Sequence, residues 1–226
     1  MAIGPEIIEE SRTSMVIQDL SDPAELSPEK SLRRMYMTVR AMLEDAIAAL
    51  KTRDETLAKD VAQRDEEVDR LYWLVAKQYH LAHMAPAGSS DAGERIGLQN
   101  DRLVAKLIER VGDHAQRIAE ASLLVGERAM DPKLLRELEG ASAASIGIFD
   151  KAFSALASQD IDLANEAIDA RNPLQKMIDG LSHHVAARKG EELLALAMIV
   201  DSVGRAGSYA TDIAEIAINN AVAGQR

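Results

Sequence analysis

The chain has 226 residues, no cysteine, a formal net charge of -11 and only 3% aromatic residues. The absence of cysteine excludes disulfides, thiolate zinc sites and cysteine nucleophiles, and the acidic charge disfavours unaided binding to nucleic acid or to anionic membranes. The low aromatic content, with Ala, Leu, Ile, Met and Glu abundant, favours packed helices over a β-sandwich or barrel. No apolar run approaches the roughly 18 to 20 residues that cross a bilayer, and no signal peptide is recognisable, so we expect a cytoplasmic chain without membrane insertion.

The N-terminal segment, residues 1–27, differs from the rest of the chain. Apolar residues cluster at 6–9 and 14–18 around a polar segment at 11–13, which predicts a short β-hairpin-like element. An isolated hairpin is marginal in water, and its edges need cover. We therefore expect it to lean on the helices, to pair with a second copy in a homodimer, or to belong to a further domain upstream.

Six long helices are predicted for the remainder of the chain. Ser27 is a favoured N-cap residue and Pro28 occupies the favoured first position, so the first helix should begin there. From Leu32 onwards the apolar residues follow the spacing of one helical face. The helices are expected at about 28–50, 54–84, 94–127, 131–157, 160–187 and 190–222. Long helices joined by short turns pack antiparallel. We therefore predict an all-α fold, a tandem pair of antiparallel three-helix bundles comprising residues 28–128 and 129–226.

Two stretches, 109–120 and 204–215, are versions of one another. Both contain an Arg-x-Gly core followed by Ala-x-x-Ile-Ala-Glu, a match that indicates one helical unit used twice. Gly112 and Gly207 are the equivalent glycines, and glycine inside a helix costs roughly 1 kcal/mol relative to alanine unless two backbones must approach closely. The first copy contains Glu109 and Asp113, where the second has no acid.

Acidic residues of the first half form two pairs at helical spacing. Asp65 and Asp69 are four residues apart on the second predicted helix, and Glu109 and Asp113 are four apart on the third. Each pair therefore points along one edge of its helix, toward a neighbouring helix. Carboxylates packed together need a positive partner, which a cation shared by two facing helices would supply. The alternative partners are the arginines Arg64, Arg70 and Arg110.

These acidic stretches, 65–71 and 109–120, resemble the paired acidic signatures of the PhoU family of phosphate-uptake regulators, and the resemblance spans roughly residues 28–222. It implies a tandem repeat of three-helix bundles whose acids bind a metal ion. In this sequence the implied ligands are Asp65, Asp69, Glu109 and Asp113. The implied cofactor is a divalent or ferric ion (Mg, Mn, Zn or Fe) bound in the first half.

Two further residues of the first half stand close to the implied ligands. His114 and Glu120 are candidates for a supporting shell around the metal, with a structural role across the bundle as the preferred interpretation of the histidine. The second half departs from the acidic pattern. The residues opposite the four acids are Arg171, Gln175, Gly204 and Ser208, so we expect no second metal site of the same kind.

The resemblance implies a regulator of phosphate uptake and phosphate signalling that acts as a metal-binding adaptor and not as an enzyme. Its implied partners are the ATPase subunit of a phosphate transporter or a sensor kinase. The sequence contains no Gly-rich phosphate loop, nucleophile elbow or zinc-hydrolase motif, which weakens a third possibility, a metal-dependent hydrolase or oxidase.

The alternative is the effector or dimerisation domain of a transcription regulator. The segment before residue 28 resembles the one that joins an AbrB-like DNA-binding domain to the helices in archaeal members of the family. A DNA-binding domain of that type would then lie upstream of this chain.

Overall fold

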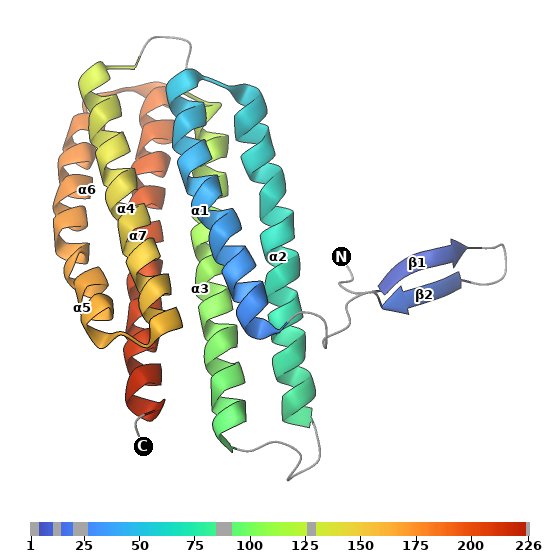
Figure 1. The fold of residues 1–226 in the computed structure, drawn as a ribbon. Coiled ribbons are helices and arrows are strands. Elements are labelled where there is room, and N and C mark those ends of the chain that lie inside the picture. The colour runs from blue at the N-terminus through green and yellow to red at the C-terminus, as the bar shows by residue number, and fades with distance from the viewer. Residues whose placement is uncertain (1–4, 11–14, 20–26, 85–91, 126–129, 225–226) are drawn as a thin grey trace.

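The structure of the chain is a computed structural model that describes residues 5–10, 15–19, 27–84, 92–125 and 130–224. These residues form two short strands followed by seven helices (Figure 1). The elements are β1 (Pro5–Glu10), β2 (Met15–Asp19), α1 (Pro28–Thr52), α2 (Glu55–Met84), α3 (Ala92–Ser122), α4 (Pro132–Ser158), α5 (Ile161–Asp169), α6 (Arg171–Val185) and α7 (Gly190–Gly224).

The predicted all-α fold is confirmed. A first unit, α1 to α3, lies beside a second unit, α4 to α7, with the helices roughly parallel to one long axis (Figure 1). The units meet where α3 packs along α7 and α1 packs on α4. Apolar residues of all seven described helices form one continuous buried cluster. The two halves of the repeat therefore share a core.

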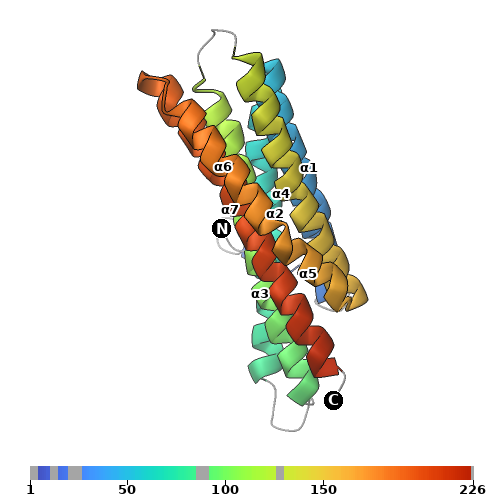
Figure 2. The same ribbon diagram turned by 90° about the vertical axis from the view of Figure 1, so that its left-hand side faces the viewer.

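The prediction of a single fifth helix, from 160 to 187, was wrong. It is divided into α5 and α6, which meet at Ala170 and Arg171. The cause is Pro173, which has no N–H to donate to the carbonyl one turn earlier and whose ring crowds that turn. Both pieces contact α4 and α7, and together they take the place of one helix. In Figure 2 they form the outer face of the second unit.

Local signals explain the other helix ends. Ser27 accepts a hydrogen bond from the Lys30 amide, so it is the N-cap that the sequence predicted, and Asp131 caps α4 in the same way. The third helix ends at Ser122 and not near 127, because the next three residues form a tighter turn. The predicted boundary at 128–131 lies partly outside the described residues.

Within the described part of the chain, one helix is long and apolar enough to span a membrane by length and composition, although the sequence had indicated none. It is α7, from Gly190 to Ala223, and half of its most apolar 18-residue window is buried in the structure. The position of α7 explains its composition, since it contacts α3, α4, α5 and α6. A helix with neighbours on several sides needs apolar residues around most of its circumference.

The N-terminal hairpin is also present. Strands β1 and β2 pair antiparallel, with a register irregularity between Ile7 and Glu9. The predicted polar turn at 11–13 lies outside the described residues. In Figure 1 the hairpin stands apart from the helices. Its expected part in a homodimer stays a prediction.

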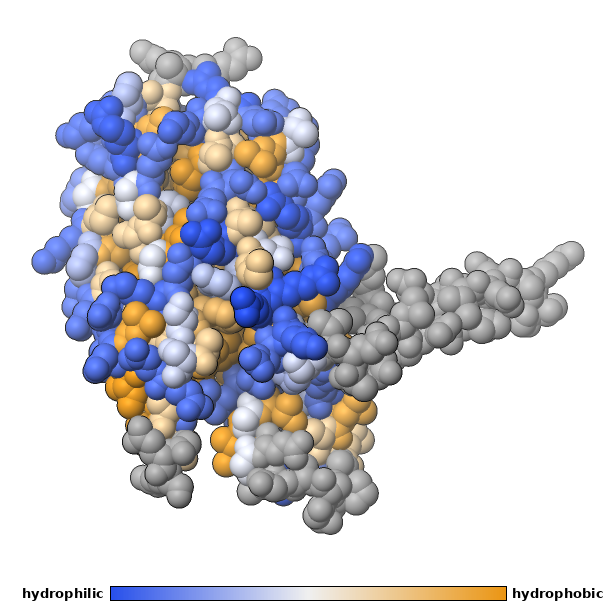
Figure 3. Space-filling model, in the orientation of Figure 1, coloured by the Kyte–Doolittle hydropathy of each residue, from blue (hydrophilic) through white to orange (hydrophobic). Residues whose placement is uncertain are grey.

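The molecular surface is mostly hydrophilic on the face shown in Figure 3, with apolar side chains gathered toward the lower end. Near that end α2 finishes and α3 begins, and Leu81, Met84 and Ile96 are exposed there. These side chains lie beyond the shared core.

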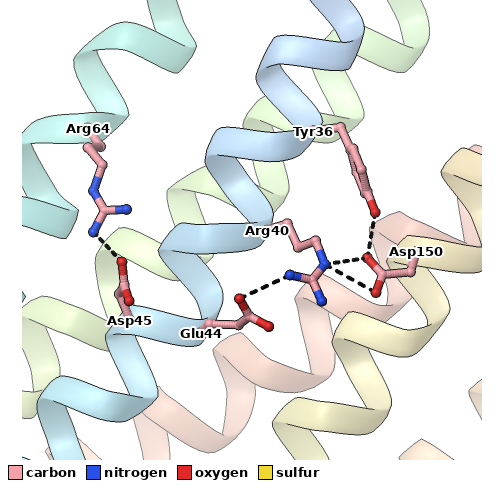
Figure 4. Close-up of polar contacts among 6 residues, drawn as sticks. All are labelled: Tyr36, Arg40, Glu44, Asp45, Arg64 and Asp150. Atoms are coloured by element: carbon pink, nitrogen blue, oxygen red, sulfur yellow. Dashed lines mark hydrogen bonds and ion pairs between the residues drawn. The ribbon is translucent and has the colours of Figure 1, made fainter.

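A polar cluster joins the two units where α1 faces α4 (Figure 4). Tyr36 donates a hydrogen bond of 2.7 Å to Asp150, and the Arg40 Nε donates to both carboxylate oxygens of Asp150 at 3.0 and 3.2 Å. The Tyr36 ring stacks on Phe153 with centroids 4.1 Å apart. Burial, reinforced by Asp150, raises the pKa of Tyr36 to about 12. Asp150 thus serves as acceptor for two residues of the other unit.

The substitution Asp150→Ala should lower the free energy of unfolding by about 1–3 kcal/mol, because it removes the acceptor of a part-buried hydroxyl and of a guanidinium. Urea unfolding measures the change. The matched control is Glu44→Ala, which removes only an exposed partner of Arg40 within α1 and should cost less than about 0.5 kcal/mol. Equal losses in the two variants would contradict a special role for Asp150.

Candidate functional site: a carboxylate cluster between α2 and α3

The four predicted acidic ligands lie on two helices that pack against each other. Asp65 and Asp69 are on α2, and Glu109 and Asp113 are on α3. Asp65 is only 9% exposed and Glu109 only 8%, whereas Asp69 and Asp113 are partly exposed. The cluster therefore reaches from the buried contact between the helices to their surface.

Electrostatics show that these carboxylates are neighbours. Burial, followed by the charges of Asp113, Asp69, Glu109 and Glu120 in that order, raises the pKa of Asp65 to about 7. The charged form of a buried carboxylate is disfavoured by desolvation, and each nearby negative charge adds to the cost. Near neutral pH a substantial fraction of Asp65 is therefore protonated.

The pKa of a second carboxylate of the cluster, Asp113, is shifted in the same direction. The pKa of Asp113 is raised by burial and by Glu109, while Lys106 and Arg110 oppose that change. The cluster thus holds more negative charge than its surroundings compensate.

Two oxygens in the cluster lack a hydrogen-bond partner among the described residues. They are Asp65 Oδ1 and Glu109 Oε2, both buried. The other oxygen of Glu109 accepts a 2.5 Å hydrogen bond from Lys106 Nζ. An unpaired buried oxygen is costly, so the site has capacity to bind a proton or a cation.

Gly112 determines how closely the helices approach at this point. A Cβ at this position would lie 3.2 Å from Val39 Cγ2 of α1 and 3.4 Å from Asp65 Oδ1 of α2. Glycine therefore lets the backbone of α3 lie against Asp65, which confirms the close approach that the sequence suggested.

The arginines considered as alternative counter-ions contribute little to this cluster. Arg64 binds Asp45 at 2.6 Å (Figure 4) and Asp60 at 2.9 Å. Arg70 lies 3.8 Å from Glu66, which is its ion-pair partner among the described residues. Arg110 remains, with its Nε 4.0 Å from Glu109.

The principal cation at the cluster is one that sequence reasoning missed. Lys106 bonds to Glu109 and lies over the ring of Tyr72, 4.9 Å from its centroid. Its spacing of three residues before Glu109 was the available signal, because residues three apart are neighbours on a helix.

His114 is buried and faces α7. Its ring stacks on Tyr209 with centroids 5.7 Å apart, and burial, followed by Arg117, lowers its pKa to about 4. The histidine is therefore neutral near pH 7 and sits at the interface between the units. Glu120 is exposed and influences the cluster through its charge alone.

With the side chains in their present orientations, the described residues contain no group of three or more histidine or acidic side chains that could hold a metal ion. The four carboxylates share one electrostatic neighbourhood without converging on a point. The metal site expected from the sequence therefore stays a prediction.

Comparison with known proteins identifies the helices that carry the cluster. The model of the PhoU domain family matches residues 32–122, which include nearly all of α1 to α3. A phosphate-specific transport system accessory protein, PhoU homolog 1 of Thermotoga maritima, is 26% identical over 196 residues, or 80% of each chain.

Two solved structures have the same fold. Crystal structures of PhoU from Pseudomonas aeruginosa and of the phosphate transport system regulatory protein PhoU from Streptococcus pneumoniae give TM-scores of 0.79 and 0.76. The sequence identities are 20% and 16%. The matches cover 87% and 88% of this chain, and 96% and 94% of the other chains. The fold extends over both units.

The substitution Asp65→Asn should stabilise the protein at pH 8 by about 1–3 kcal/mol in the presence of a chelator. The unfolded carboxyl ionises near pH 4, whereas the folded one keeps its proton up to about pH 7. The contribution of Asp65 to wild-type stability is therefore highest below pH 4 and falls as pH rises to about 7. Asparagine cannot ionise, so its advantage should appear across this window and vanish near pH 4. Thermal unfolding at each pH measures it.

The matched control is Glu66→Gln, an exposed acid on the same helix, which should change the pH profile little. If Asp65→Asn instead lowered stability equally at pH 5 and pH 8, Asp65 would be an ionised and well-paired carboxylate.

Proposed function

We propose that this chain is a member of the PhoU family and an accessory protein that regulates phosphate uptake. The observation that carries the proposal is the match of the PhoU domain to residues 32–122, the segment that contains the carboxylate cluster. Relatives in several bacteria are named as accessory proteins of phosphate-specific transport systems. Their shared description supports a regulatory role.

We propose that the protein acts by contact with another protein and not by catalysis. Long helices over a shared core provide extended surfaces for such contacts. The expected partners are the ATPase subunit of a phosphate transporter or a sensor kinase. The net charge of -11 favours a partner that presents a basic surface.

We further propose that the carboxylate cluster is a regulatory metal site. Its donors are carboxylate oxygens, which suit hard cations, and two of its buried oxygens have no hydrogen-bond partner among the described residues. Asp65, Asp69, Glu109 and Asp113 would hold the ion after changes of side-chain rotamer. The bound ion would supply positive charge that offsets the repulsion among the carboxylates.

Added Mn²⁺ should raise the melting temperature of the wild-type protein by about 5–10 °C at a concentration about 100 times the Kd, because an ion that binds only the folded state stabilises it. The double variant Asp65→Ala/Glu109→Ala should lose this rise and the metal measured by elemental analysis. The matched control, Asp162→Ala/Glu166→Ala, removes an acidic pair of the same spacing from the exposed surface of α5 and should behave as wild type. Equal metal content in all three proteins would place the ion elsewhere.

Deletion of the gene in its own host should alter phosphate accumulation when phosphate is plentiful, because a regulator that restrains uptake is then absent. Uptake of radiolabelled phosphate measures the change, and the intact gene supplied in trans should restore it. Unchanged uptake, together with tight binding of duplex DNA by the full-length native protein at physiological salt, would replace this proposal with the transcription-effector alternative.

A further inference from the structure

A cavity of about 410 Å³ lies between α6 and α7 in the second unit. Helix α6 contributes three lining residues and α7 contributes the rest. The lining residues are Arg171, Gln175, Ile178, Asp201, Gly204, Arg205, Ser208, Tyr209 and Asp212.

This cavity occupies the place in the second unit that the carboxylate cluster occupies in the first. The two glycines of the repeat establish the correspondence. A Cβ at Gly112 would meet Val39 of α1 and Val68 of α2, and a Cβ at Gly207 would meet Ile148 of α4 and Leu174 of α6. Helix α6 therefore corresponds to α2, and α7 corresponds to α3.

The residues that replace the four acids all line the cavity. They are Arg171, Gln175, Gly204 and Ser208. Four carboxylates are thus exchanged for one cation and three neutral residues at the same point of a repeated architecture. At Gly204, which replaces Glu109, the Ile178 side chain of α6 packs against the α7 backbone, because a Cβ there would lie 3.3 Å from Ile178 Cγ1. A site of this kind no longer suits a metal ion.

Arg171 provides a positive group that is available to a ligand. It forms no hydrogen bond or ion pair with any other residue that the structure describes. Its guanidinium charge therefore attracts an anion.

The other charged groups that line the cavity balance one another more closely. Arg205 is paired with Asp201 at 3.6 Å. Asp212 is partly buried, and burial, followed by Glu215, raises its pKa while Arg171 lowers it. The hydroxyl of Ser208 donates to the Gly204 carbonyl at 3.1 Å and can still accept a hydrogen bond.

We propose that this cavity binds a small ligand that carries an oxyanion. Arg171 would be the main contact of the oxyanion, with Arg205 and Ser208 beside it. The cavity is larger than one tetrahedral anion, so the ligand carries further atoms or retains water. Carboxylate and phosphate groups share the required chemistry. The proposal does not depend on the role in phosphate uptake.

Calorimetric titration of the full chain with inorganic phosphate, and in parallel with acetate, at constant ionic strength tests the proposal. Saturable binding of either probe is expected. Arg171→Gln should weaken it about tenfold or more, since a charge-assisted hydrogen bond is lost. Ser208→Asp, which restores the acid of the first unit, should weaken it at least as much by repulsion. The preferred probe decides whether the oxyanion is of phosphate or carboxylate type.

The matched control is Arg136→Gln, which removes an exposed arginine of α4 outside the cavity and should leave the affinity unchanged. Circular dichroism verifies that each variant is folded. Absence of saturable binding of both probes overturns the proposal. Equal affinity in wild type and Arg171→Gln also overturns it, because the anion then binds elsewhere.

Discussion

The packing of α3 along α7 is the contact on which the rest of the structure depends. Ile108 and Ile118 of α3 and Ile199 and Ile213 of α7 are fully buried. Each of these two helices also contacts the other helices of its own unit. Burial of apolar area at roughly 25 cal/mol per Å² makes this shared core the main source of stability. The outer helices gain their positions from these two.

The packing of α3 lets the first unit keep carboxylates where their charges are unfavourable. Asp65 and Glu109 are both buried, and the cations that the structure places beside Glu109 are Lys106 at 2.5 Å and Arg110 at 4.0 Å. Burying like charges destabilises the folded chain, and the surrounding packing offsets that cost. Such local destabilisation is typical of sites kept for binding and not for stability. The carboxylate cluster therefore differs from the α1–α4 contact, where the Asp150 carboxylate accepts hydrogen bonds from Tyr36 and Arg40.

The sequence predicted the fold well because its signals are local. Apolar spacing, the cap at Ser27 and the repeated glycines fixed the helices within a few residues at most ends. The break before Pro173 was readable in principle, since a proline three residues into a helix marks a beginning. It was overlooked because the apolar spacing continues across it.

The candidate site was predictable only in part. Helical spacing placed the four acids on the facing edges of two helices, and the structure brings those helices together. Lys106 could have been found from its spacing of three residues before Glu109. Spacing along one helix does not determine which residue of a neighbouring helix a side chain reaches, so the pairing of Arg64 with Asp45 of α1 was not predictable. The orientation of His114 toward α7 depends on contacts between the units, which no local pattern encodes.

The stacking of His114 on Tyr209 bears on the origin of the protein. These two residues occupy the same position in the two copies of the repeat, yet they touch each other across the α3–α7 interface. Equivalent residues meet in this way only at an axis of two-fold symmetry, as in an isologous dimer. The contact is thus the one that two copies of a single three-helix protein would make, and gene duplication followed by fusion accounts for it. Once the two copies were joined, each was free to diverge, and a histidine facing a tyrosine replaced what symmetry had required to be a pair of identical side chains.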